Sequence, residues 1–190
     1  MTSLVRLGDV TKMLQGRVPA KTTEHGTGPR FFGMAEISGH PPRVVEPGVD
    51  LSQATYLQKE DVVVALLGDL GKSAIVGDSG DGAVLGRECA ALRVSSPDRL
   101  LPSWVFAWTQ SPHFKAQVAA HASGAVMRRV NVRALAGFFL PLPTLSYQRE
   151  LEEEVSRYDT VLTATRELIQ TLEDLRSAAG SLAMARAAET

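Results

Sequence analysis

The sequence predicts an α+β fold: a β-rich region with a few helices, followed by a long C-terminal helix that can form a coiled coil. Three observations support this prediction. Short apolar runs separated by Gly, Pro and Asp fill residues 1–143, which is typical of short strands. Residues 144–190 contain no proline and one glycine, and their apolar residues recur at helical spacing. The 190 residues are 44% hydrophobic and 22% charged, as in an ordinary globular protein.

Residues 1–143 are expected to form one domain. Apolar runs predict strands at residues 31–37, 62–67, 73–76 and 89–94. Ser111-Pro112 is typical of a helix start, and Asn131 can cap a helical turn that ends at Leu135. Residues 138–143 predict an edge strand, because two prolines cannot donate to a sheet ladder. The segment Thr22–Gln53, rich in Gly and Pro, is longer than a normal connection and predicts a functional or disordered loop.

Residues 144–190 are expected to form one helix with Ser146 as its N-cap and glutamates in its first turns. Apolar residues recur every seven positions and form a stripe wider than a two-residue seam. This stripe packs either on the chain's own domain or on another chain, and its length favours another chain. The residues predicted to form the dimer seam are Val155, Tyr158, Leu162, Leu168, Ile169, Leu172 and Leu175.

Composition excludes several classes of protein. No apolar run is long enough to span a membrane, and the N-terminus has no signal-peptide pattern, so we expect a cytoplasmic protein. The single cysteine, Cys89, excludes an internal disulfide and a cysteine-based zinc cluster. The net charge of −1 divides unevenly. Residues 1–148 carry 15 Lys and Arg against 12 Asp and Glu, a net +3, and residues 149–190 carry 5 against 9, a net −4.

The stretch Gly77-Asp78-Ser79-Gly80 matches the tetrapeptide around the nucleophile of trypsin-like proteases. A serine nucleophile needs a histidine base and a partner that orients the base. None of the four histidines stands in the sequence setting of that base, and Asp81 replaces the second glycine of the protease motif. We interpret the stretch as a polar turn between two short β segments.

No other catalytic or metal-binding pattern is complete. His113 and His121 lie two turns apart on one predicted helix, which is too far to share a metal. Gly71-Lys72 lacks the spacing of a phosphate-binding P-loop.

Four segments, in order, resemble those of one known family. They are VRLGDVTKMLQGRVP (5–19), KEDVVVALLGDLGKSAIV (59–76), the helical segment 101–135, and FFLPLPTLSYQREL (138–151). Together the four resemble the specificity subunit of type I restriction–modification systems, in a half-length form. That form has one target-recognition domain, residues 1–143, and one spacer helix, residues 144–190. One departure is Asp69-Leu70, where the family often has small or β-branched residues.

The resemblance implies a DNA-recognition subunit that performs no chemistry and binds no cofactor itself. Full-length members carry two such domains, so two copies of this chain are expected to pair through antiparallel helices. The homodimer would bind double-stranded DNA at a bipartite site with inverted half-sites. It would direct a methyltransferase subunit, which binds S-adenosylmethionine, and in some systems a restriction and translocase subunit.

Basic residues on predicted loops and one helix are the candidates for DNA contacts, since lysine and arginine bind phosphates and arginine binds guanine. They are Arg17, Lys21, Arg30, Arg43, Lys72, Lys115, Arg128 and Arg129.

Two alternatives remain open at this point. The chain could be a protein-interaction module with a dimerising helix and no DNA role, or an enzyme of an unrecognised type. The sequence also leaves open whether it is a natural half-length subunit or part of a longer one. The target sequence, the gap between half-sites and the methylated base are not encoded in any recognisable motif.

Overall fold

The computed structural model describes residues 3–125 and 127–188 and has an α+β fold, as predicted. The chain divides into two compact units, residues 1–149 and residues 150–190. The strands are β1 (Ser3–Arg6), β2 (Thr11–Gln15), β3 (Thr22–Thr23), β4 (Arg30–Phe32), β5 (Arg43–Val45), β6 (Val62–Ala65), β7 (Ser73–Ile75), β8 (Val84–Leu85), β9 (Cys89–Val94) and β10 (Phe139–Leu142). The helices are α1 (Leu7–Val10), α2 (Met34–Ile37), the 3₁₀ turn η1 (Asp78–Gly80), α3 (Pro102–Gln110), α4 (Pro112–His121), α5 (Val132–Ala136) and α6 (Leu145–Ala188).

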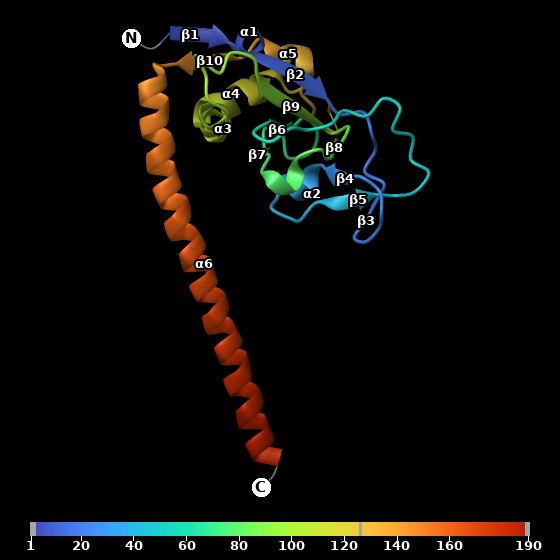
Figure 1. Ribbon diagram of the computed structural model, residues 1–190, viewed down its shortest axis with the longest axis vertical. Coiled ribbons are helices and arrows are strands. Elements are labelled where there is room, and N and C mark those ends of the chain that lie inside the picture. The colour runs from blue at the N-terminus through green and yellow to red at the C-terminus, as the bar shows by residue number, and fades with distance from the viewer. Residues whose placement is uncertain (1–2, 126, 189–190) are drawn as a thin grey trace. The chain divides into compact units, whose positions relative to one another are not determined.

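The first unit is organised around an antiparallel sheet with strand order β2-β9-β6-β7. The two central strands are rich in valine and alanine and are buried on both faces, so alternate residues point into different cores. One face packs on the helices through Val62, Val64, Ala90, Leu92, Trp108 and Phe114. The other packs toward the second sheet through Val63, Ala65, Cys89, Ala91, Phe32 and Leu85. Figure 1 shows α3 and α4 on one side of this sheet and β4, β5 and β8 on the other.

The second sheet has the strand order β3-β5-β4-β8, with β4 and β8 parallel. The turn at Asp78–Gly80 joins β7 to β8, which agrees with its interpretation as a polar turn, but these two strands belong to different sheets. The prediction of a loop over Thr22–Gln53 is wrong, since this segment contains β3, β4, α2 and β5.

The strand predicted at residues 31–37 is correct only at Phe31 and Phe32. After Phe32 the chain turns into α2, because the Glu36 carboxylate accepts a hydrogen bond from the Gly33 backbone N–H at 2.7 Å. This is half of a capping box, in which a carboxylate at the third helical position satisfies a free N–H at the helix start. Glu36 is buried and also pairs with Arg43 at 3.1 Å.

Several locally predicted features are confirmed. Ser111 caps α4 by accepting from the Phe114 N–H at 3.3 Å, and Asn131 caps α5 by accepting from the Arg133 N–H at 2.8 Å. The proline-containing strand β10 pairs with β1 alone in the described chain, as expected for an edge strand.

Helix α6 begins at Leu145, so Ser146 lies inside its first turn and the prediction of Ser146 as N-cap is wrong. The helix continues to Ala188, and its first turn belongs to the first unit. Within residues 3–125 and 127–188, no helix is long and apolar enough to cross a membrane.

Candidate nucleic-acid interface

The first unit has an open groove of about 630 Å³ at the end of strand β2. It is lined by Gln15-Gly16, by Leu66-Leu67, by Arg87-Glu88, and by Ser123 with residues 129–132. A second hollow of about 500 Å³ shares Gln15 with this groove and extends it toward the loop at residues 52–55. The charged, amide and hydroxyl side chains of the combined surface are those of Gln15, Arg17, Ser52, Gln53, Thr55, Arg87, Glu88, Ser123, Arg129 and Asn131. We call this surface the arginine groove.

Two glycines hold the centre of the arginine groove together. A Cβ atom on Gly16 would lie 1.9 Å from the carbonyl oxygen of Gly86, so only glycine allows the two backbones to pass this closely. The Gly16 N–H donates to the Cys89 carbonyl at 3.1 Å, and the Arg87 N–H donates to the Val18 carbonyl at 2.9 Å. The contact therefore fixes the backbone on which Arg17 and Arg87 are mounted.

Two arginines of the groove are each held by one neighbour. Arg17 Nη1 donates to Gln53 Oε1 at 3.1 Å, and Arg87 Nε donates to Glu88 Oε1 at 3.3 Å. Both side chains are exposed, so these contacts limit their motion while leaving other N–H groups open to a ligand.

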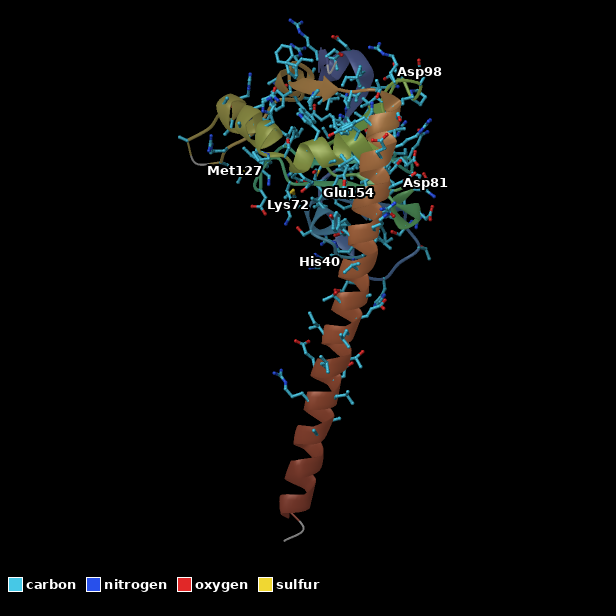
Figure 2. The ribbon with its side chains drawn as sticks, turned by 90° about the vertical axis from the view of Figure 1, so that its left-hand side faces the viewer. His40, Lys72, Asp81, Asp98, Met127 and Glu154 are labelled. Carbon is cyan, nitrogen blue, oxygen red and sulfur yellow. The ribbon has the colours of Figure 1, made fainter. Side chains whose placement is uncertain are left out.

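Arg129 lies on a hairpin closed by two backbone hydrogen bonds with Ser123 of 2.8 and 3.0 Å. The hairpin is anchored to the central sheet where the Val130 N–H donates to the Leu66 carbonyl at 3.0 Å. Gly124 has φ +108°, a conformation that glycine adopts without strain, and it allows the chain to turn here. Figure 2 shows Met127 on this loop, which extends past the end of α4.

The other predicted DNA-binding residues lie outside the arginine groove. Arg43 is engaged by the buried Glu36, and Arg30 donates to the Asp81 carbonyl at 2.9 Å. Lys72 donates to Ser38 Oγ at 2.9 Å, and Arg128 donates to the Ala119 carbonyl at 3.3 Å.

Lys21 and Lys115 are exposed. Of the eight predicted residues, the structure thus brings Arg17 and Arg129 together in the groove. Contact of any of the eight with DNA remains a prediction.

Sequence reasoning missed Gln15, Gln53, Arg87, Glu88 and Asn131 as lining residues. Gly86-Arg87 directly follows β8 and lies just before the buried strand β9. Gly16-Arg17 directly follows β2, so the same Gly-Arg pair occurs at the ends of two strands. That repeated Gly-Arg pattern at strand ends is a sequence signal that could have found Arg87.

The surroundings of Ser79 and Cys89 bear on whether either side chain could act as a nucleophile. Ser79 lies in the exposed turn η1, where the neighbouring Asp78 pairs with Lys59 at 2.7 Å. Burial raises the pKa of the Cys89 thiol to about 12, which keeps it neutral at physiological pH. Within residues 3–125 and 127–188, no group of His, Cys, Asp and Glu could hold a metal ion.

The apolar stripe of α6 is exposed. The large apolar side chains of the stripe are between 39% and 63% exposed, and they are Val155, Tyr158, Val161, Leu168, Ile169, Leu172 and Leu175. The predicted seam residue Leu162 lies on the helix, but its side chain is outside the described residues. Such a row of large apolar side chains is unfavourable in water, so this face of the helix requires an apolar surface to cover it.

Comparison with known proteins agrees with the resemblance found in the sequence. Residues 3–174 match the family model of the type I restriction modification DNA specificity domain. No curated protein matches the chain.

Three solved structures have a similar fold. A chain from a structure on complex assembly and conformational transition of the type I R-M system has TM-score 0.63 at 22% identity, with 86% of this chain and 39% of that chain covered. The type I restriction-modification S subunit from M. genitalium has TM-score 0.62 at 13% identity, covering 84% and 39%. The HsdS subunit from Thermoanaerobacter tengcongensis has TM-score 0.61 at 21% identity, covering 86% and 38%.

The fold is therefore that of a type I specificity subunit, with one domain and one long helix. The chain belongs to the type I restriction modification DNA specificity domain family. It spans about two fifths of the length of the solved chains it matches, 39%, 39% and 38%.

Proposed function

We propose that this chain recognises a DNA sequence for a type I restriction–modification system and performs no chemistry itself. The observation that carries the proposal is the family match over residues 3–174, which includes the whole domain and most of the helix. The arginine groove supports it, because it gathers arginine, glutamine and asparagine, the residue types that hydrogen-bond to guanine and adenine.

The chain acts as a homodimer in this proposal. The exposed stripe on α6 needs a second apolar helix, and a second copy supplies the same stripe. In an antiparallel pair each domain lies at the opposite end of the helices from the other. The dimer then contacts two inverted half-sites separated by bases that neither domain touches.

The partners are double-stranded DNA and a methyltransferase subunit, which carries S-adenosylmethionine. One chain of similar fold comes from a structure that describes complex assembly of the type I R-M system, and this similarity supports a role in a multi-subunit complex. A restriction and translocase subunit is a further partner in systems that cleave DNA. The protein acts in the cytoplasm, where its DNA target lies.

The test combines mass measurement with selection from a random DNA library. Analytical ultracentrifugation of the 20.4-kDa chain should give a dimer, and adding the methyltransferase subunit should give a larger complex. That complex should then select a duplex with two inverted half-sites. A strict monomer that binds no methyltransferase subunit would overturn the dimer and the recruiting role. A dimer that selects no DNA sequence would instead support a protein-interaction module.

A further inference from the structure

We propose that Arg87 and Glu88 together recognise one G·C base pair in each half-site, with Arg87 on guanine and Glu88 on cytosine. This inference rests on the proposed DNA-binding function and names the base pair that the arginine groove selects. Both residues line the groove and are joined from Arg87 Nε to Glu88 Oε1 at 3.3 Å.

The two side chains have different exposure, which fits different roles. Arg87 is 64% exposed and extends from the groove wall, and Glu88 is 20% exposed and stays within it. Glu88 engages Arg87 through Nε, and among the described residues neither Nη atom of Arg87 has a hydrogen-bond partner. The two terminal nitrogens are therefore available to donate side by side to one ligand.

The backbone beneath the pair is rigid. The Arg87 N–H donates to the Val18 carbonyl at 2.9 Å, and the Glu88 carbonyl accepts from the Leu66 N–H at 2.8 Å. Just before the pair, the Gly86 N–H donates to the Phe32 carbonyl at 2.9 Å. Three separate segments thus fix this short stretch, and a specificity contact needs such support because a loose side chain discriminates poorly.

The chemistry of the pair selects a base edge over a phosphate. A carboxylate beside the guanidinium repels a phosphate, so a plain phosphate contact would favour an arginine without Glu88. In the major groove, guanine offers two adjacent acceptors, O6 and N7, which match the two donors of an arginine fork. Cytosine in the same pair offers the N4 amino donor, which a glutamate accepts. Adenine offers one acceptor and one donor on this edge, which a two-donor fork does not match.

The test uses the full chain in complex with its methyltransferase subunit. Selection from a random duplex library first gives the half-site, and binding is then measured to duplexes carrying each of the four base pairs at every selected position. The wild-type complex should prefer G·C at one position of each half-site by about 10-fold or more. Arg87→Ala should reduce the preference at that position to about twofold and leave the other positions unchanged.

Two further variants separate base recognition from phosphate binding. Arg87→Lys keeps the charge but loses the fork, so it should lose the G·C preference like Arg87→Ala. Glu88→Ala should weaken the preference while raising affinity for unrelated DNA, since a negative charge is removed. Arg6→Ala removes an exposed arginine from β1, outside the groove, and should leave the preference unchanged.

Two results would overturn the inference alone. One is uniform weakening by Arg87→Ala at all positions with rescue by Arg87→Lys, which is the behaviour of a phosphate contact. The other is a selected half-site in which Arg87→Ala alters no position. A wild-type complex that selects no sequence would overturn the proposed DNA recognition, and this inference with it.

Discussion

Gln148, in the first turn of α6, donates from Nε2 to the carbonyl oxygen of Arg99 at 2.8 Å. The same amide donates to the Pro143 carbonyl at 3.0 Å, and its Oε1 accepts from the Leu101 N–H at 2.9 Å. Gln148 is 1% exposed, so one side chain satisfies three backbone groups in the interior. This contact fastens the start of the helix into the first unit.

Gln148→Leu should destabilise the first unit by about 1–3 kcal/mol, because it leaves buried backbone groups without partners. Urea unfolding followed by tryptophan fluorescence measures this loss. The matched control is Gln58→Leu, since the Gln58 side chain is exposed and its change should cost less than about 0.5 kcal/mol. Equal effects of the two substitutions would contradict the role given to Gln148.

The buried Asp61 and the partly exposed Arg93 form a two-point ion pair, with Arg93 Nε and Nη2 at 2.8 and 2.7 Å from the carboxylate oxygens. Asp61 is 1% exposed, so removing the arginine leaves a buried charge uncompensated. Arg93→Met should lower the free energy of unfolding by about 3 kcal/mol. Lys12→Met, on the exposed side chain paired opposite Arg93 in β2, is the control and should be near neutral. Similar melting temperatures for both variants would refute the prediction.

Gly16→Ala should disturb the arginine groove, because the new methyl group would lie 1.9 Å from the Gly86 carbonyl oxygen. The two backbones must separate, which displaces Arg17 and Arg87. We expect a clear loss of sequence-specific DNA binding together with a lower melting temperature. Gly77→Ala is the control, since its Cβ would meet nothing within 4 Å and its φ is −87°. Full specific binding by Gly16→Ala would argue against the groove as the DNA-binding surface.

The Cys89 thiol should report on unfolding. Burial raises its pKa from 9.0 to about 12, so the folded protein should react slowly with a thiol reagent at pH 8 and rapidly in urea. Above pH 9 the unfolded chain ionises at this thiol while the folded chain does not, which favours the unfolded state. The contribution of Cys89 to stability is therefore intact below pH 9 and is lost as pH rises toward 12. Cys89→Ala should reduce the decline of stability with pH in that window, and an unchanged decline would show that other groups cause it.

Leu172→Glu should weaken the proposed dimer, because it places a charge in the exposed apolar stripe of α6. Sedimentation velocity across a concentration series should show dissociation at concentrations where the wild type remains dimeric. Thr171→Glu adds the same charge beside the stripe and is the control. If both variants dissociate equally, the effect comes from charge on the helix and not from the stripe.

Local patterns were sufficient for much of the fold. The strand predictions at 62–67, 73–76 and 89–94 overlap β6, β7 and β9, and the caps at Ser111 and Asn131 are present. Each of these features depends on residues close in sequence. Local patterns do not predict the strands at residues 22–53, because these strands are two or three residues long and are stabilised by pairing with each other and with β8.

By itself the sequence determined the α+β class, the long helix with its apolar stripe, and the family resemblance, because these depend on local spacing and on the order of segments along one chain. The tertiary structure alone decided which basic residues share a surface. Arg17, Arg87 and Arg129 are far apart in the chain, and they line the two adjoining hollows of the arginine groove because their segments converge there. It also decided that Arg43 pairs with Glu36, since a buried carboxylate requires a nearby positive charge. Charge alone does not distinguish an arginine held inside the domain from one that faces a ligand.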